Sequence, residues 1–339
     1  MQLVDQAACS RPHGPTTQHP LVSSVRWSAI LSLVLTTLFL GVGPIGADES
    51  LWVYTQGTDT RPQSSWEVRL ANISRLGKDG QDYTFHDFRP EIEYGITDRL
   101  TIGVEAMLFH HDYAVETDDL EPMFETQGGA GGSFEDTQLA GLEVTLKYNL
   151  LSPYKDGLGL SLGFSYEYRD IYRLDGADIV QSSYVPTLYL QKNFLDDTLV
   201  FAFKGKLEFE LRTSPGVEEE EIAPDLALGV SYRVAPKWFV GLEARYQSDF
   251  LEPREEGEPP PEDPSEFTNL GEFRIGLQYQ WAYYAGPTLH YAEKDWWVTL
   301  GALWQIEGGG DESNPSVRDG KVWDEHEEVH VGLTFGFEF

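Results

Sequence analysis

Apolar and polar residues alternate with a period of two, in segments of about ten residues, from Ser65 to the end of the chain. In one such segment Leu100, Ile102 and Val104 form an apolar face, and Glu105 lies on the polar face. This alternation predicts β-strands with two unlike faces. Twelve segments show it, near 65–76, 83–96, 99–113, 139–151, 158–172, 183–194, 199–211, 225–235, 238–249, 273–291, 296–306 and 329–339.

The connections between most of these segments alternate between short and long. The short ones are 97–98, 152–157, 195–198, 235–237 and 293–295, and the longer ones include 114–138, 212–224, 250–272 and 307–328. Bacterial outer-membrane barrels combine an even strand number with short periplasmic turns and long extracellular loops. The pattern therefore predicts an all-β fold: a transmembrane antiparallel up-and-down β-barrel of about 12 strands over 65–339. The long segment 273–291 contains Gly286-Pro287, so an extra turn within it stays open.

A soluble barrel or β-sandwich is the alternative explanation of alternating strands. Two features favour the membrane barrel. Aromatic residues stand at strand ends on the apolar faces, as interfacial girdles do: Trp238, Trp281, Tyr283, Trp296 and Trp304. The polar faces are also too charged for a dry core, because a buried unpaired charge costs several kcal/mol.

The N-terminal region predicts export. Arg26 precedes an apolar run over 27–45, and Ala47 provides a small residue before Asp48. This is the pattern of a secretory signal peptide, here residues 1–47 with an over-long n-region, cleaved after Ala47. A membrane anchor helix is disfavoured because glycines and a proline break the run. We expect 48–64 to be an N-terminal periplasmic segment, with a small plug or an extra edge segment as alternatives. The expected location is the Gram-negative cell outer membrane.

Composition excludes several kinds of chemistry. Cys9 is the one cysteine and precedes the predicted cleavage point, so the mature chain lacks disulfides, thiolate metal sites and cysteine nucleophiles. The 24 basic and 56 acidic residues give a formal net charge of −32, which disfavours nucleic acid as a partner.

The excess acid lies in the long loops, at Glu116, Asp118, Asp119, Glu121 and Glu125 and within 218–221, 252–263 and 311–328. They could capture divalent cations or reject anions at the pore mouth, but no spacing matches a calcium loop. A solvated, repulsive surface is the simpler interpretation. We therefore expect no metal and no cofactor.

The final strand resembles the C-terminal signal that the barrel-assembly machinery reads. Its alternating residues are Leu333, Phe335, Phe337 and Phe339, and Thr334 stands where this signal usually has glycine. The expected partners are this machinery, outer-membrane lipid and lipopolysaccharide, and a small solute.

If the apolar faces meet lipid, the polar faces line the lumen. The charged residues expected there are Arg89, Glu91, Glu93, Glu105, Glu143, Lys147, Glu167, Arg169, Lys204, Lys206, Glu208, Glu210, Arg233, Glu243, Arg245 and Arg274. They could form a network of ion pairs that braces the wall, or line a water-filled path for solutes.

A catalytic site is not expected. The predicted lipid faces show no Ser and His pair that could cleave a lipid. His110-His111-Asp112 stands at a strand top, where a loop enzyme could use it, but neighbouring histidines on a strand point to opposite faces. His290 and His330 are interpreted as wall residues.

Several short stretches resemble one family. They are Gly77-Lys78-Asp79, the run from Asp87 to Leu100, Gly286 to Tyr291 and Trp296 to Leu300. The chain resembles proteobacterial outer-membrane proteins known only as a domain of unknown function, related to the meta-pathway phenol-degradation outer-membrane group. The resemblance implies a barrel, and the label of the larger group implies uptake of aromatic compounds.

The leading functional hypothesis is passive or facilitated passage of a small solute through a polar lumen. The alternative is a closed structural or surface-interaction barrel without transport, and a loop-borne enzyme is third.

Overall fold

The structure is a computed structural model that describes residues 50–114, 133–214, 217–251, 268–312 and 314–339. The predicted signal peptide, its cleavage point, Cys9 and two acidic stretches, within 115–132 and 252–267, lie outside the described residues. Among the described residues, no helix has the length and apolar character needed to cross a membrane.

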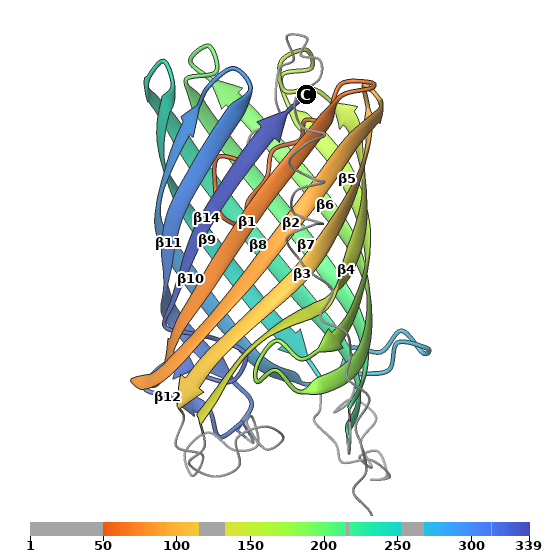
Figure 1. The fold of residues 1–339 in the computed structure, drawn as a ribbon, viewed down its shortest axis with the longest axis vertical. Coiled ribbons are helices and arrows are strands. Elements are labelled where there is room, and N and C mark those ends of the chain that lie inside the picture. Colours follow the sequence, from red (N-terminus) through yellow and green to blue (C-terminus); the bar gives the residue numbers. More distant parts are fainter. Residues whose placement is uncertain (1–49, 115–132, 215–216, 252–267, 313) are drawn as a thin grey trace, which may run out of the picture. The chain divides into compact units, whose positions relative to one another are not determined.

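Twelve strands form a closed antiparallel barrel, as the alternation predicts (Figure 1). They are β1 (Trp66–Lys78), β2 (Gln81–Thr97), β3 (Leu100–Ala114), β4 (Ser133–Leu151), β5 (Gly159–Ile171), β6 (Asp178–Phe194), β7 (Leu199–Ser214), β8 (Val217–Ala235), β9 (Trp238–Phe250), β10 (Gln278–Ala292), β11 (Trp296–Gly310) and β14 (Val329–Glu338). The short strands β12 (Val317–Arg318) and β13 (Lys321–Val322) pair only with each other.

Each barrel strand pairs with its neighbours in sequence, and β1 closes the barrel against β14. The closing pair runs from Glu67 opposite Glu338 to Leu76 opposite Val329. Backbone hydrogen bonds between Trp66 and Phe339 extend this seam. Closure removes the free strand edges, which a membrane barrel needs because lipid offers no hydrogen-bond partners.

Several strands differ in extent from the prediction. β7 continues to Ser214 and β8 already begins at Val217, so both strands include residues expected to form a loop. The alternation weakens there because both strand faces are polar. β10 begins at Gln278, five residues later than expected, and continues through Gly286 and Pro287 opposite β9. The extra turn considered for this segment therefore does not form.

The two ends of the barrel differ. We call the end with the turns 98–99, 152–158, 195–198, 236–237 and 293–295 the turn end. It lies at the top of Figure 1, together with the C-terminus. The opposite end, which carries β12 and β13, is called the loop end. The conventional orientation of such barrels places the turn end in the periplasm.

The outer face of the barrel is apolar, as expected for contact with lipid. Exposed apolar side chains alternate with buried ones along the strands: Leu142, Val144, Leu146 and Tyr148 of β4 are examples. Of the predicted girdle, Trp238, Tyr283 and Trp304 are exposed on this face.

The N-terminal segment, residues 50–64, lies inside the barrel at the turn end, where Figure 1 shows it in red. This is the plug arrangement and not the periplasmic segment that we expected. The sequence left the plug only as an alternative, because the segment lacks periodicity and its partners lie far away in sequence.

Candidate functional site

One carboxylate of the wall holds the middle of the N-terminal segment. Glu243 of β9 accepts hydrogen bonds from the backbone N–H groups of Val53 (2.9 Å), Tyr54 (2.9 Å) and Thr55 (2.6 Å). The indole of Trp52 lies against Gly229, where a Cβ would meet the ring at 2.4 Å. This glycine therefore makes room for the segment.

Arg61 fixes the other end of the N-terminal segment. Its buried guanidinium pairs with Glu67 at 2.8 Å, with Glu338 at 3.3 Å and with Glu93 at 3.6 Å. These carboxylates belong to β1, β14 and β2, so one arginine ties the segment across the barrel seam. A buried charge needs such compensation, because an isolated one costs several kcal/mol.

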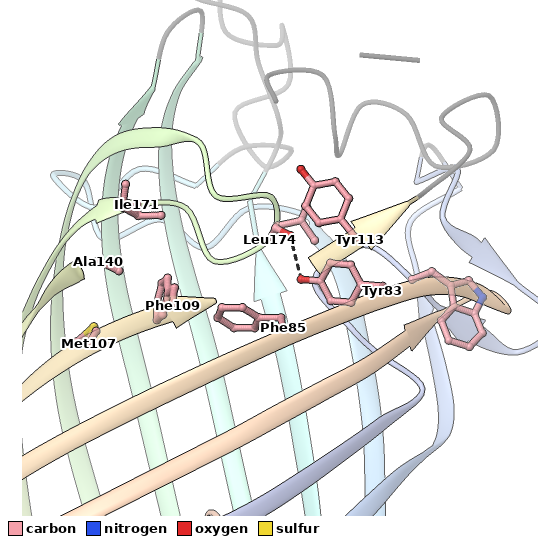
Figure 2. Close-up of a cluster of buried hydrophobic side chains, with 9 residues drawn as sticks. Tyr83, Phe85, Met107, Phe109, Tyr113, Ala140, Ile171 and Leu174 are labelled. Carbon is pink, nitrogen blue, oxygen red and sulfur yellow. Dashed lines mark hydrogen bonds between the residues drawn. The ribbon is translucent and has the colours of Figure 1, made fainter. Parts of the chain in front are cut away.

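The loop end is filled by an aromatic cluster on the inner wall (Figure 2). Tyr83, Phe85, Met107, Phe109 and Tyr113 of β2 and β3 point inward and are buried. The connection after β5 covers them, and the Tyr83 hydroxyl donates to the carbonyl of Leu174 at 2.9 Å. The polar-face prediction missed this apolar patch, although the inward Phe85 and Phe109 share the parity of Asp87 and Glu105.

The segment from Trp323 to Glu328, called the inner loop, also enters the lumen at the loop end. Lys78 is fully buried and donates to the carbonyls of Trp323 at 3.2 Å and His326 at 3.1 Å. Glu325 pairs with Arg173 and accepts a hydrogen bond from the Tyr172 hydroxyl at 2.5 Å. The inner loop thus bridges from β1 to the connection after β5.

The pKa values of two neighbouring carboxyls of the inner loop shift in opposite directions. Burial raises the pKa of Asp324 to about 7, and the adjacent Glu325 charge adds to this. Burial acts in the same direction on Glu325, but the charges of Arg173 and Arg212 outweigh it and lower the pKa of Glu325 to about 2. Glu325 is therefore ionised at neutral pH, whereas Asp324 titrates close to it.

A hydrogen-bonded chain connects the inner loop to the N-terminal segment. The Tyr54 hydroxyl lies 2.7 Å from Nδ1 of His330, and Nε2 of His330 lies 3.0 Å from Glu327. Because a carboxylate only accepts, His330 donates from Nε2 and accepts from Tyr54 at Nδ1. His330 is thus a wall residue, as predicted, and it contacts both segments that fill the lumen.

Next to the N-terminal segment, whose Val53 and Tyr54 line it, lies a cavity of about 220 Å³. Arg173, the ion-pair partner of Glu325 in the inner loop, also lines this cavity. All the predicted luminal charges line it except Glu210, Arg233, Glu243 and Arg274. Glu210 is buried nearer the loop end beside Arg169, and Arg233 lies at the turn end beside Asp197. Glu243 is occupied by the N-terminal segment.

Arg274 is the one predicted luminal residue that lies outside the barrel strands. It precedes β10 and pairs with Glu272. The error follows from starting the strand at 273 instead of Gln278.

The cavity also contains charges that the prediction missed: Arg69, Arg75, Asp87, Arg173 and Asp225. Four of them share the parity of inward residues on their strands, so an extension of the alternation would have found them. Arg173 lies outside the strands, and no periodic signal points to it.

Each carboxylate that lines the cavity lies close to an arginine. Arg89 lies 2.8 Å from Asp87, 3.0 Å from Glu105, 3.4 Å from Glu143 and 3.6 Å from Glu167. The other lining carboxylates also lie within 4.0 Å of an arginine: Glu91, Glu93, Glu208 and Asp225. The ion-pair network weighed from the sequence therefore exists.

His86, His110 and His111 form ring stacks in the described part of the chain. His110 stacks on His86 with ring centroids 5.8 Å apart, and His111 stacks on Phe85 inside the barrel at 4.7 Å. They point to opposite faces, as predicted. Within the described ranges, no group of three or more His, Cys, Asp or Glu residues could hold a metal ion.

These features define an outer-membrane β-barrel of the porin-like class, with twelve strands and a charged lumen. The chain belongs to a family of unknown function, DUF6662, whose model matches residues 44–339. This confirms the resemblance to a domain of unknown function, while the relation to the phenol-degradation group stays a prediction. A search of curated proteins found no match.

Several solved structures of outer-membrane proteins are similar to this chain. The COG4313 outer membrane channel from Pseudomonas putida F1 is similar, with 10% identity, 83% of this chain and 98% of that chain covered, and a TM-score of 0.51. The NanC porin has 10% identity, coverages of 80% and 98%, and a TM-score of 0.44. The KdgM porin in complex with disordered oligogalacturonate has 12% identity, coverages of 80% and 99%, and a TM-score of 0.43.

Proposed function

We propose that this protein mediates passage of a small solute across the outer membrane. The supporting observation is the charged cavity inside a closed barrel, lined on one side by the N-terminal segment. A charged surface of this kind retains water, and water carries polar solutes. The N-terminal segment occupies part of the lumen and therefore limits the size of the solute.

The proposal includes the cellular setting. Residues 1–47 act as the signal peptide, the apolar outer face contacts lipid and lipopolysaccharide, and the barrel-assembly machinery inserts the chain. The orientation follows the turn end, which faces the periplasm. No reaction and no cofactor is part of this function.

Conductance of the protein extracted from outer membranes, measured in planar lipid bilayers, tests the proposal. We expect small discrete steps. Ala223→Trp should abolish them, because Ala223 lines the cavity and an indole would fill it. Leu228→Trp is the matched control, since Leu228 lies on the same strand and faces outward with 55% exposure.

A closed structural barrel is the second candidate. The observation that favours it is the tight packing of both segments that enter the lumen, with Trp52 of the N-terminal segment and His326 of the inner loop almost fully buried. Absence of conductance in the wild type and in a variant with a released N-terminal segment would favour this candidate over passage.

A further inference from the structure

Two lysines of the cavity differ from all the arginines there. Lys204 and Lys206 of β7 line it side by side on the inner face of the strand. In the described part of the chain, neither lies within 4.0 Å of a carboxylate. The arginines, in contrast, each have at least one such partner.

The spacing of these two lysines suits an anion. Residues two apart on one strand face lie about 7 Å apart. The two ammonium groups therefore repel each other, and no carboxylate among the described residues contacts either of them. A carboxylate has two oxygens and about four acceptor positions. It can therefore accept hydrogen bonds from both ammonium groups at once, and such charge-assisted bonds are the strong ones.

An aromatic ring extends the same wall. Tyr189 of β6 lies opposite Lys204 in the register, with the Lys204 Nζ 5.9 Å from the ring centroid. The Lys147 Nζ lies 4.8 Å from the same centroid. Gly163 makes room for this ring, because a Cβ there would meet it at 2.9 Å. The wall thus joins positive charge to an aromatic surface.

The remaining surface of the cavity is partly apolar. Ala223 and Ala227 flank Asp225 on β8, Ile73 comes from β1, and Val53 comes from the N-terminal segment. Inorganic anions gain nothing from contact with such groups, whereas an organic body gains free energy from burial against them. Both kinds of surface are used only by a solute that has a charged group and an apolar part.

We propose that Lys204 and Lys206 form a binding site for a small organic carboxylate inside the barrel. The site rests on the proposed function only for the route by which the anion reaches the cavity. It names the solute class that passage favours. The matched arginine and carboxylate pairs elsewhere in the cavity give no comparable site for a cation.

Equilibrium binding to the detergent-solubilised full barrel, measured by titration calorimetry, tests the site with benzoate, butyrate, inorganic phosphate and benzylamine. Wild type should bind benzoate and butyrate more tightly than phosphate or benzylamine. Lys204→Gln with Lys206→Gln should weaken carboxylate binding at least about tenfold, which corresponds to about 1.4 kcal/mol.

Two further variants separate binding from folding. Lys155→Gln with Lys294→Gln removes the same two charges from the turn end and should bind benzoate as wild type does. Lys204→Arg with Lys206→Arg keeps both charges and should retain binding to within about threefold, or about 0.7 kcal/mol. The folded fraction of each variant is read from its heat-modifiable migration in gels.

Equal benzoate binding by wild type and the glutamine pair would overturn the site, as would absence of benzoate binding to wild type. Phosphate or benzylamine binding as tight as benzoate would also overturn it. Carboxylate binding without conductance would support the site and contradict passage. Conductance without carboxylate binding would support passage and contradict the site.

Discussion

Glu243 controls whether the N-terminal segment stays in the lumen. Glu243→Ala removes the acceptor of three backbone N–H groups, those of Val53, Tyr54 and Thr55. Each unsatisfied buried donor costs about 1–3 kcal/mol, so the docked state loses roughly 3–9 kcal/mol if the costs add. Undocking limits this loss, because water can then satisfy the three donors.

We therefore expect Glu243→Ala to release residues 51–57 while the barrel stays folded. Thr58 keeps its hydrogen bonds to Gln191 and Asn149, and Arg61 keeps its ion pairs. A Val53→Cys background reports the release by maleimide labelling, since the chain has only Cys9, before the predicted cleavage point. Labelling should accelerate at least tenfold, which needs about 1.4 kcal/mol of lost docking, and conductance should increase.

Glu243→Gln keeps one acceptor oxygen and should give intermediate labelling. Glu293→Ala, at the turn end outside the lumen, is the control and should leave labelling unchanged. Unchanged labelling in Glu243→Ala would refute the argument that this carboxylate holds the segment. Loss of heat-modifiable barrel would instead show that Glu243 supports the wall.

Three more predictions follow from single contacts. Gly229→Ala should displace Trp52 and lower the unfolding temperature, because overpacking costs about 1–3 kcal/mol. Gly271→Ala is the control, since its Cβ has room. Equal unfolding temperatures of the two variants would argue against the contact between Gly229 and Trp52. Because burial raises the pKa of Asp324 to about 7, the closed inner loop gains stability as pH falls from 8 to 5. The protection of its amides, measured relative to the intrinsic exchange rate at each pH, should therefore increase, and Asp324→Asn should remove this increase. Deleting Phe339 should lower the amount of folded barrel in the outer membrane. The deletion removes two backbone hydrogen bonds to Trp66 and the final residue of the assembly signal. Unchanged amounts of folded barrel would contradict this prediction.

The sequence predicted the barrel because each membrane-crossing strand must alternate between lipid and lumen. Leu142 and Val144 show the outward side of this rule, and Glu143 shows the inward side. The same parity placed most of the charged cavity correctly. It did not predict where β7 ends and β8 begins. Beyond the membrane both faces of these strands are polar, so apolar and polar residues no longer alternate there.

The contents of the lumen could not be predicted in this way. Tyr54 meets Glu243 across 189 positions of sequence, and Lys78 meets Glu327 across 249. Such contacts depend on the closed barrel bringing distant segments together, and no local pattern encodes them. The inward Phe85 likewise breaks the polar rule because the connection after β5 covers it.

Access of water-soluble reagents to the cavity tests the account most directly. In liposomes, a small membrane-impermeant thiol reagent should modify Ala223→Cys, which lines the cavity, and should spare Leu228→Cys, which faces lipid on the same strand. Millimolar benzoate should slow the first reaction. Protection of Ala223→Cys from reagents added on either side of the membrane would contradict a hydrated, solute-accessible lumen.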